Sequence, residues 1–359
     1  MRKFSLILLA FCFALASGMA QQLTWSVDFS SVLDNREGDS SNDQTIFFTR
    51  LAPEIGVVLP GGEHRISGGV VWNQPVGNGW HDYKLCPTLY YRYSKDAWRV
   101  NFGMFSRNYL MEQAPKYLWS DSIAYQQPNV RGVLMQYVKP RGYVELMLDW
   151  RQLQSETQRE AFNACLNTRY AFGERGVLQI GERLQYNHLA KQKNAPEDQG
   201  VNDDFMFNPW VGLDLSKATS LDSLSLRAGA VVSMQRCRAD GEGWRNAAGV
   251  LVEAGAQWRW LGVRETFYAG GNLMPLYIKY GAELNMGSPY YQAKTYSRTD
   301  VYAHIVSNRY VDFEAAVNVH VTKDIVALWQ QLSLRVYIDQ SLFKSGEKAA
   351  KCHKLCNMY

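Results

Sequence analysis

Long hydrophobic runs are missing from most of this 359-residue sequence. After the first 20 residues no stretch of about 18 apolar residues occurs, which excludes a helical membrane protein. Cysteine is scarce too, and the later part of the chain holds an odd number at wide spacing: Cys86, Cys165, Cys237, Cys352 and Cys356. An exported disulfide framework needs an even number at dense spacing. The fold therefore does not depend on disulfide bonds.

A strong charge of one sign and the common catalytic motifs are also missing. The formal net charge is +4, and no stripe of Lys and Arg interleaved with aromatic residues occurs, so nucleic acid is not an expected partner. There is no HExxH, no G-x-S-x-G, no Walker loop and no paired CxxC. Cys352, His353 and Cys356 lack an evident fourth ligand and suit a polar tail better than a zinc site. We expect no enzyme, no cofactor and no metal.

The N-terminus has the composition of a cleaved export signal. Arg2 and Lys3 precede a short apolar stretch, residues 4–16, and small residues follow at 17–20. This stretch is too short to span a membrane, and we predict cleavage after Ala20. Cys12 offers a lipoprotein alternative, but the bulky Phe11 stands where a lipid-attachment site needs a small residue.

Alternating polar and apolar residues reconcile a hydrophobic content of 47% with the lack of hydrophobic runs. In residues 23–30, Leu23, Trp25, Val27 and Phe29 alternate with polar residues, which is typical of a strand between two environments. About sixteen segments show this pattern: 23–30, 45–59, 64–73, 85–93, 98–105, 130–138, 143–150, 162–170, 178–186, 205–213, 224–232, 250–258, 263–268, 301–307, 311–321 and 331–339. Two of them are short, so about fourteen to eighteen strands remain possible.

The connectors alternate between tight and long. Tight turns are expected at 60–63, 94–97, 139–142, 172–176, 259–262 and 307–309, and looser polar stretches at 32–44, 74–84, 106–129, 188–203, 235–248 and 269–300. Outer-membrane barrels have short periplasmic turns and longer outer loops, whereas a soluble sandwich has no reason to sort its connectors. Trp72, Trp98, Trp150, Trp258 and Trp329 lie at or near strand ends, as interfacial girdles require. The sequence therefore predicts an all-β, transmembrane, antiparallel up-and-down barrel in the cell outer membrane.

No linker divides the chain, so one barrel domain is expected. We assign 1–20 to the signal peptide, 21–343 to the barrel and 344–359 to a C-terminal polar tail. Phe343 could be the terminal aromatic of the last strand, which would make the Lys-rich tail a departure from the usual barrel ending.

Four segments carry a resemblance to a known group. They are GMFSRNYL (103–110), SDSIAYQQPNVRG (120–132), GYVELMLDWRQLQSETQREAF (142–162) and LMPLYIKYGAELNMGSPYY (273–291). In these segments the chain resembles the uncharacterised porin-like outer-membrane β-barrel proteins of the Bacteroidetes. The resemblance implies location and architecture, and it brings no substrate or catalytic residue with it.

Inward-facing charges suggest a function. By strand phase, the following residues should line the lumen: Arg92, Arg99, Arg131, Glu145, Asp149, Arg169, Arg183, Arg227, Glu253, Arg264, Asp312, Glu314, Arg335 and Asp339. Charge in a barrel interior must be hydrated or paired, and a barrel of about sixteen strands is wide enough for a channel. We therefore expect a passive diffusion channel for small hydrophilic solutes. The long connectors 106–129 and 269–300 are rich in aromatic residues and could fold inward to narrow it.

Two other functions stay open. The barrel could be plugged and structural, with loops that bind a partner. It could also be a hydrolase at the barrel mouth that uses His81–Asp82 and Asp203–Asp204, although neighbouring residues of one strand point to opposite faces. Expected partners are outer-membrane lipid, small hydrophilic solutes and, as a possibility, further copies of the chain.

Overall fold

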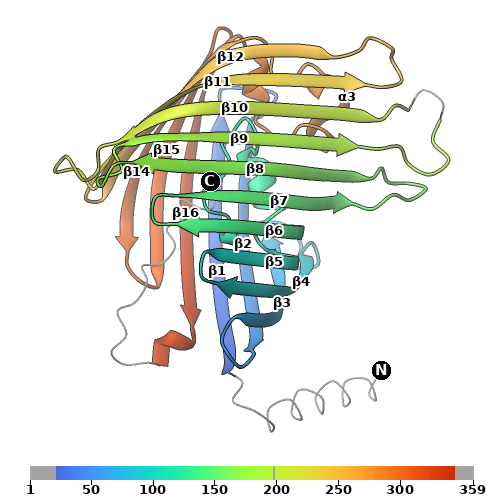
Figure 1. Cartoon of the computed structure of the whole chain (residues 1–359). Helices are drawn as coiled ribbons and strands as arrows, with labels where there is room; N and C mark the ends of the chain where they lie inside the picture. Colours follow the sequence, from blue (N-terminus) through green and yellow to red (C-terminus); the bar gives the residue numbers. More distant parts are fainter. Residues whose placement is uncertain (1–21, 197–198, 344–359) are drawn as a thin grey trace.

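The computed structural model describes residues 22–343 except 197–198. In these residues, sixteen antiparallel strands close into one barrel in which each strand pairs with its neighbours in sequence, as Figure 1 shows. The strands are β1 (Gln22–Glu37), β2 (Gln44–Val58), β3 (His64–Pro75), β4 (Lys84–Lys95), β5 (Trp98–Ser106), β6 (Asn129–Lys139), β7 (Gly142–Gln152), β8 (Ala161–Phe172), β9 (Leu178–Leu189), β10 (Asn202–Asp214), β11 (Ser223–Cys237), β12 (Arg245–Trp258), β13 (Leu261–Gly270), β14 (Thr295–Ser307), β15 (Val311–Thr322) and β16 (Val326–Asp339). The predicted transmembrane up-and-down barrel is confirmed.

The first and last strands close the sheet. β1 pairs with β16 in a register that places Val27 opposite Ile338 and Phe29 opposite Val336. The last strand ends at Asp339 and a 3-10 turn, η4 (Gln340–Phe343), follows it, so Phe343 does not end a strand. The predicted signal peptide and the tail with Cys352 and Cys356 lie outside the described residues.

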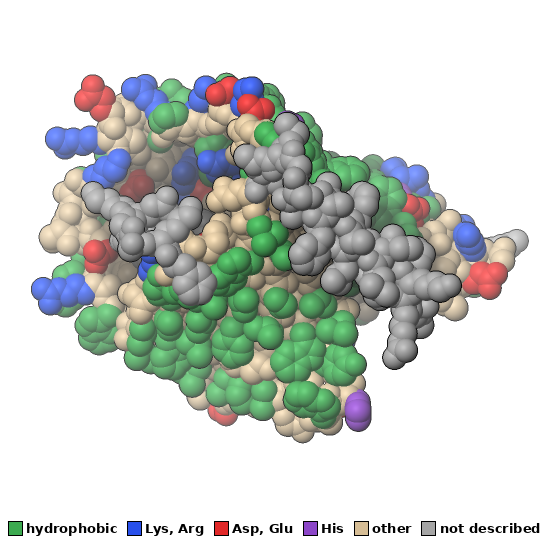
Figure 2. All heavy atoms as spheres, turned by 90° about the horizontal axis from the view of Figure 1, so that it is seen from below, with side chains coloured by type: hydrophobic (Ala, Val, Ile, Leu, Met, Phe, Trp, Pro, Cys, Tyr) green, Lys and Arg blue, Asp and Glu red, His purple; other side chains and the backbone are tan. Residues whose placement is uncertain are grey.

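Period-two alternation separates an outer wall from an interior. Leu89, Phe102 and Val250 are among many large apolar side chains that are exposed on the outer wall. Figure 2 shows hydrophobic side chains over much of this wall, and charged side chains gathered around a hollow. Of the predicted girdle residues, Trp329 is an exception, because it is buried and lies 4.0 Å, ring to ring, from His320.

Several predicted connectors are shorter than expected. β1 continues to Glu37, and β14 begins at Thr295, because both strands carry their alternation through residues that were assigned to loops. The two longest connectors, 107–128 and 271–294, contain short helices: η1 (Arg107–Tyr109), α2 (Asp121–Gln126), α3 (Tyr277–Tyr280), η2 (Gly281–Glu283) and η3 (Pro289–Gln292). Within the described residues, no helix is long and apolar enough to cross a membrane.

The two ends of the barrel differ. Short connectors such as 96–97, 140–141 and 259–260 lie at one end, called here the short-turn end, and both long connectors start from the other, the long-loop end. By the general rule for such barrels, the short-turn end faces the periplasm and the long-loop end faces outward.

Candidate functional site

Two connectors fold back into the barrel from the long-loop end. They are the inner segments 107–128, between β5 and β6, and 271–294, between β13 and β14. Tyr117 and Tyr291, one from each segment, are each 1% exposed and meet edge to face with ring centroids 5.8 Å apart. The Ser288 amide donates to the Lys116 carbonyl oxygen at 2.7 Å, which joins the two backbones. The aromatic content of both connectors had predicted this inward folding.

The inner segments pack against strands around the whole barrel. Tyr117 and Leu273 belong to an apolar cluster that includes inward residues of β10 to β14 and of β16. Tyr125 packs with Val32 and Phe48 of β1 and β2, and Leu276 and Leu284 pack with residues of β8 and β9. This apolar layer fills the interior on the side of the long-loop end.

Ion pairs hold the 107–128 segment to the wall. Glu112 accepts hydrogen bonds from Arg169 Nη1 at 2.9 Å and from Arg227 Nη1 at 2.8 Å, and Arg183 Nη2 lies 3.9 Å from its Oε2. Burial alone would raise the pKa of Glu112, but the three arginines hold this pKa below its ordinary value. The charged carboxylate therefore links the segment to β8, β9 and β11.

Further pairs repeat this arrangement along the segment. Asp121 binds Arg298 of β14 at 2.6 Å, and Arg107 binds Asp149 of β7. Burial acts against the charge of Asp121, yet Arg298 and Lys116 hold the pKa of this carboxyl far below its ordinary range. Both inward residues, Arg298 and Asp149, thus gain a partner that is remote in sequence.

The strand phases place nearly all of the predicted lumen residues on the inner face. These are Arg92, Arg99, Glu145, Asp149, Arg169, Arg183, Arg227, Glu253, Arg264, Asp312, Glu314, Arg335 and Asp339. Arg131 is the exception, because it is exposed in phase with Met135 and Tyr137, which face outward. It stands near the long-loop end of β6, where an outward arginine costs only about 0–1 kcal/mol.

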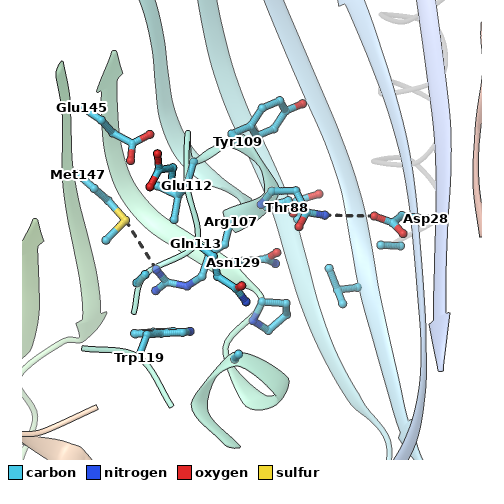
Figure 3. Close-up of a pocket in the computed structure, with 18 of the residues that line it drawn as sticks. Asp28, Thr88, Arg107, Tyr109, Glu112, Gln113, Trp119, Asn129, Glu145 and Met147 are labelled. Atoms are coloured by element: carbon cyan, nitrogen blue, oxygen red, sulfur yellow. Dashed lines mark hydrogen bonds between the residues drawn. The ribbon is translucent and has the colours of Figure 1, made fainter. Parts of the chain in front are cut away.

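A cavity of about 430 Å³ lies beneath the 107–128 segment, on the side of the short-turn end. Figure 3 shows Arg107, Tyr109, Glu112 and Trp119 of the segment beside inward residues of the wall. Tyr310 and Ser341, from connections at the short-turn end, also line it. The interior thus has an apolar layer near one end and a charged cavity near the other.

A second polar cluster lies on the outer wall at the long-loop end. His188 is the penultimate residue of β9, and Asp203 is the second residue of β10, directly opposite it in the register. His188 Nδ1 lies 3.0 Å from Asp203 Oδ1. The carboxylate also accepts hydrogen bonds from Arg236 Nε at 2.8 Å and Arg238 Nε at 2.9 Å. These residues (His188, Asp203, Arg236 and Arg238) are called here the rim cluster.

Aromatic side chains surround the rim cluster. Phe162 stacks on His188 with centroids 5.0 Å apart, and Arg236 lies 4.3 Å from the ring of Trp244. The Asp203 side chain is 1% exposed, whereas His188 is 17% exposed. Within the described residues, no hydrogen bond reaches His188 Nε2. The pair therefore has the form of an oriented imidazole with one nitrogen left for a proton transfer.

The structure separates the residues of the predicted barrel-mouth site. Asp203 and Asp204 point to opposite faces, as their adjacency in a strand predicted, and Asp204 accepts hydrogen bonds inside the barrel from Gln235 and Asn285. Asp82 accepts from the Gly79 amide in its own loop. The partner of Asp203 is His188, which the sequence analysis missed. Leu189 and Asn202 flank the loop between β9 and β10. His188 and Asp203 are the next residues outward on the two strands, so a hairpin closed by this loop places them opposite each other.

A family model covers most of the chain. The model described as "Lipid A 3'-O-deacylase-type" matches residues 15–344. The chain belongs to this family. The expectation that it is not an enzyme is therefore wrong, because the family is named for an ester-cleaving activity. The sequence carries none of the common linear catalytic motifs, so a search for such motifs gives no sign of an enzyme.

Solved structures share the barrel fold. A loop L8 deletion mutant of OmpT, an outer-membrane protein of Vibrio cholerae, matches with a TM-score of 0.52 and 10% identity over 89% of this chain and 100% of that one. OprD of Pseudomonas aeruginosa gives 0.49 and 9% identity over 89% and 96%, and OprB of Pseudomonas putida gives 0.48 and 10% over 91% and 96%. No curated protein matches the chain. The expected porin-like outer-membrane barrel fold is confirmed. The expected link to proteins of the Bacteroidetes stays a prediction.

Proposed function

We propose that the protein is an acyl-ester hydrolase that removes an acyl chain from an outer-leaflet lipid of the lipid A class, with His188 as its catalytic base. Two observations support this proposal. The chain belongs to the lipid A 3'-O-deacylase-type family. The 3.0 Å contact between His188 Nδ1 and Asp203 is the observation that carries the site, because it lies on the outer wall where a lipid ester can reach it.

The chemistry follows from the orientation of the imidazole. Asp203 is a positioning residue that holds the proton on Nδ1, so that Nε2 can take a proton from water. The resulting hydroxide attacks the ester carbonyl carbon. The C–O bond then breaks, and the Nε2 proton passes to the leaving alkoxide, giving a free fatty acid and an alcohol. Arg236 and Arg238 keep N–H groups beyond those bound to Asp203, and these can bind the negative charge on the carbonyl oxygen.

The test uses the full chain in mixed micelles with lipid A, and mass spectrometry measures loss of one acyl chain. We expect His188→Ala to lower the rate by at least about 100-fold, since general base catalysis contributes about 10² to 10⁴. Asp203→Asn should also lower the rate. His81→Ala is the matched control, because His81 is exposed in the β3–β4 loop and should leave the rate unchanged. Full activity in His188→Ala would refute the proposed base.

Passage of small hydrophilic solutes is a second candidate function. The charged cavity that extends to the short-turn end favours it, since such a space can hold hydrated solutes. Passage through the barrel would also require the inner segments to move, because their apolar layer lies across the remaining interior. Conductance of the purified protein in planar bilayers measures such passage directly.

A further inference from the structure

The cavity beneath the 107–128 segment has no part in the proposed hydrolysis. The rim cluster lies on the outer wall at the long-loop end, whereas the cavity lies inside and extends to the short-turn end. Its volume of about 430 Å³ is within the range of about 300–1,000 Å³ that is usual for small-molecule sites. Its lining therefore needs an explanation of its own.

The roof of the cavity is largely apolar. The inner segment supplies Leu110, Ala114, Pro115, Leu118, Trp119 and Ala124 to it. An apolar surface in contact with water is unfavourable. An apolar part of a bound solute that covers this surface removes it from water and so stabilises the complex. The roof is also held in place, because Glu112 and Asp121 of the same segment pair with the wall.

Two arginines stand together on the wall of the cavity. Arg65 of β3 and Arg92 of β4 are direct register partners, and both line the cavity. Like charges directly opposite each other destabilise a strand pair unless something compensates them. Neither arginine forms an ion pair with any carboxylate in the described part of the chain. The carboxylate of Glu54, on the neighbouring strand β2, accepts a hydrogen bond from Tyr90 OH at 3.1 Å.

The side chains of both arginines are held in position. The guanidinium of Arg92 lies 4.7 Å from the ring of Tyr109, which joins it to the roof segment. Its Nε is buried and has no hydrogen-bond partner among the described residues. Arg65 Nε donates to Ser67 Oγ at 2.7 Å, which fixes the start of its guanidinium while its terminal nitrogens stay available. A planar anion between the two guanidinium groups can accept hydrogen bonds from both of them.

We propose that the cavity binds a small amphipathic organic monoanion. Its charged group lies between Arg65 and Arg92, and its apolar part lies under Leu118 and Trp119. The class follows from the lining. Neither arginine has an ion-pair partner among the described residues, so one compact negative group can bind between them, and the apolar roof can bind an apolar body. A neutral molecule of the same shape would leave the arginines opposed and unpaired.

The experiment uses the full chain in detergent and 4-fluorophenylacetate as the probe, with binding followed by ¹⁹F NMR against empty micelles. We expect saturable binding of the carboxylate and at least tenfold weaker binding of the neutral 4-fluorophenylacetamide. The double variant Arg65→Gln/Arg92→Gln should weaken binding of the carboxylate at least tenfold, and Ala52→Trp should abolish it by filling the cavity. Equal binding of acid and amide, or unchanged binding by the double variant, would overturn the proposal.

Two controls separate this site from general effects. Arg99→Gln removes an inward charge of β5 that does not line the cavity, and it should leave binding unchanged. His188→Ala should also bind the probe normally, so failure of the hydrolysis proposal would leave this one standing. Loss of binding in Arg99→Gln equal to that in the double variant would show a nonspecific charge effect and refute the site.

Discussion

At the scale of single residues, the interior charges show which features the sequence predicts, because their direction follows from the strands and their partners come from a connector. Arg169, Arg183 and Arg227 point inward by strand phase, and the sequence shows that much. Their shared partner, Glu112, comes from a connector, and it lies 115 positions before Arg227. No spacing rule links such positions. The inward direction of these charges was therefore predictable, whereas their pairing, which decides whether the lumen is open, was not.

Removing the shared carboxylate should destabilise the barrel. In Glu112→Gln, Arg169 and Arg227 lose their counter-charge, whereas Arg183 keeps its ion pair with Glu253 at 2.7 Å. Breaking a buried ion pair by removing one partner costs about 3–5 kcal/mol. Because Glu112 is partly reached by solvent, we expect the lower end, about 3 kcal/mol, from urea unfolding in phospholipid vesicles. Glu174→Gln in an exposed turn is the matched control and should be neutral. A Glu112→Gln variant as stable as the parent would show that the pairs contribute nothing.

The same variant predicts a pH dependence. The folded pKa of Glu112 lies below its ordinary value of 4.5, so its contribution to stability is fully present above that value. It is lost as the pH falls through the lower folded pKa. The stability difference between parent and Glu112→Gln should therefore be constant from pH 7 to 5 and shrink below about pH 4. A difference that grows on acidification would contradict the assignment.

At the scale of elements, strands were more predictable than connectors. A strand between lipid and interior repeats every two residues, so its phase is visible in sequence. Arg131 was assigned inward by strand phase, but in the structure it is in phase with Met135, which faces outward. Near the membrane interface a charged side chain can face outward at little cost, so its charge does not fix its direction. Asp203 is also a charged residue that faces outward near a strand end, and there it lies opposite His188 of β9.

The 107–128 segment should control passage through the barrel. The segment contributes ion pairs with the strands and also part of the apolar layer. Its removal should therefore keep the sixteen-stranded wall and open the interior. We expect deletion of residues 108–126 to raise single-channel conductance in planar bilayers several-fold. Deletion of 239–243, an exposed outer loop, is the control and should not change it. Unchanged conductance after the first deletion would show that this segment does not limit passage.

At the scale of the whole molecule, every assignment of sidedness depends on which end of the barrel faces outward. The rim cluster can meet an outer-leaflet lipid only if the long-loop end is outside, and the cavity then faces the periplasm. Two exposed glutamates test this. Glu156 lies in the β7–β8 loop at the long-loop end, and Glu174 lies in the β8–β9 turn at the other end. We expect Glu156→Cys to react with a membrane-impermeant maleimide on intact cells, and Glu174→Cys to react only after the outer membrane is opened, with the parent chain as baseline. The reverse labelling pattern would show that the long-loop end faces the periplasm. His188 would then lie at the inner leaflet, where it could not act on lipid A.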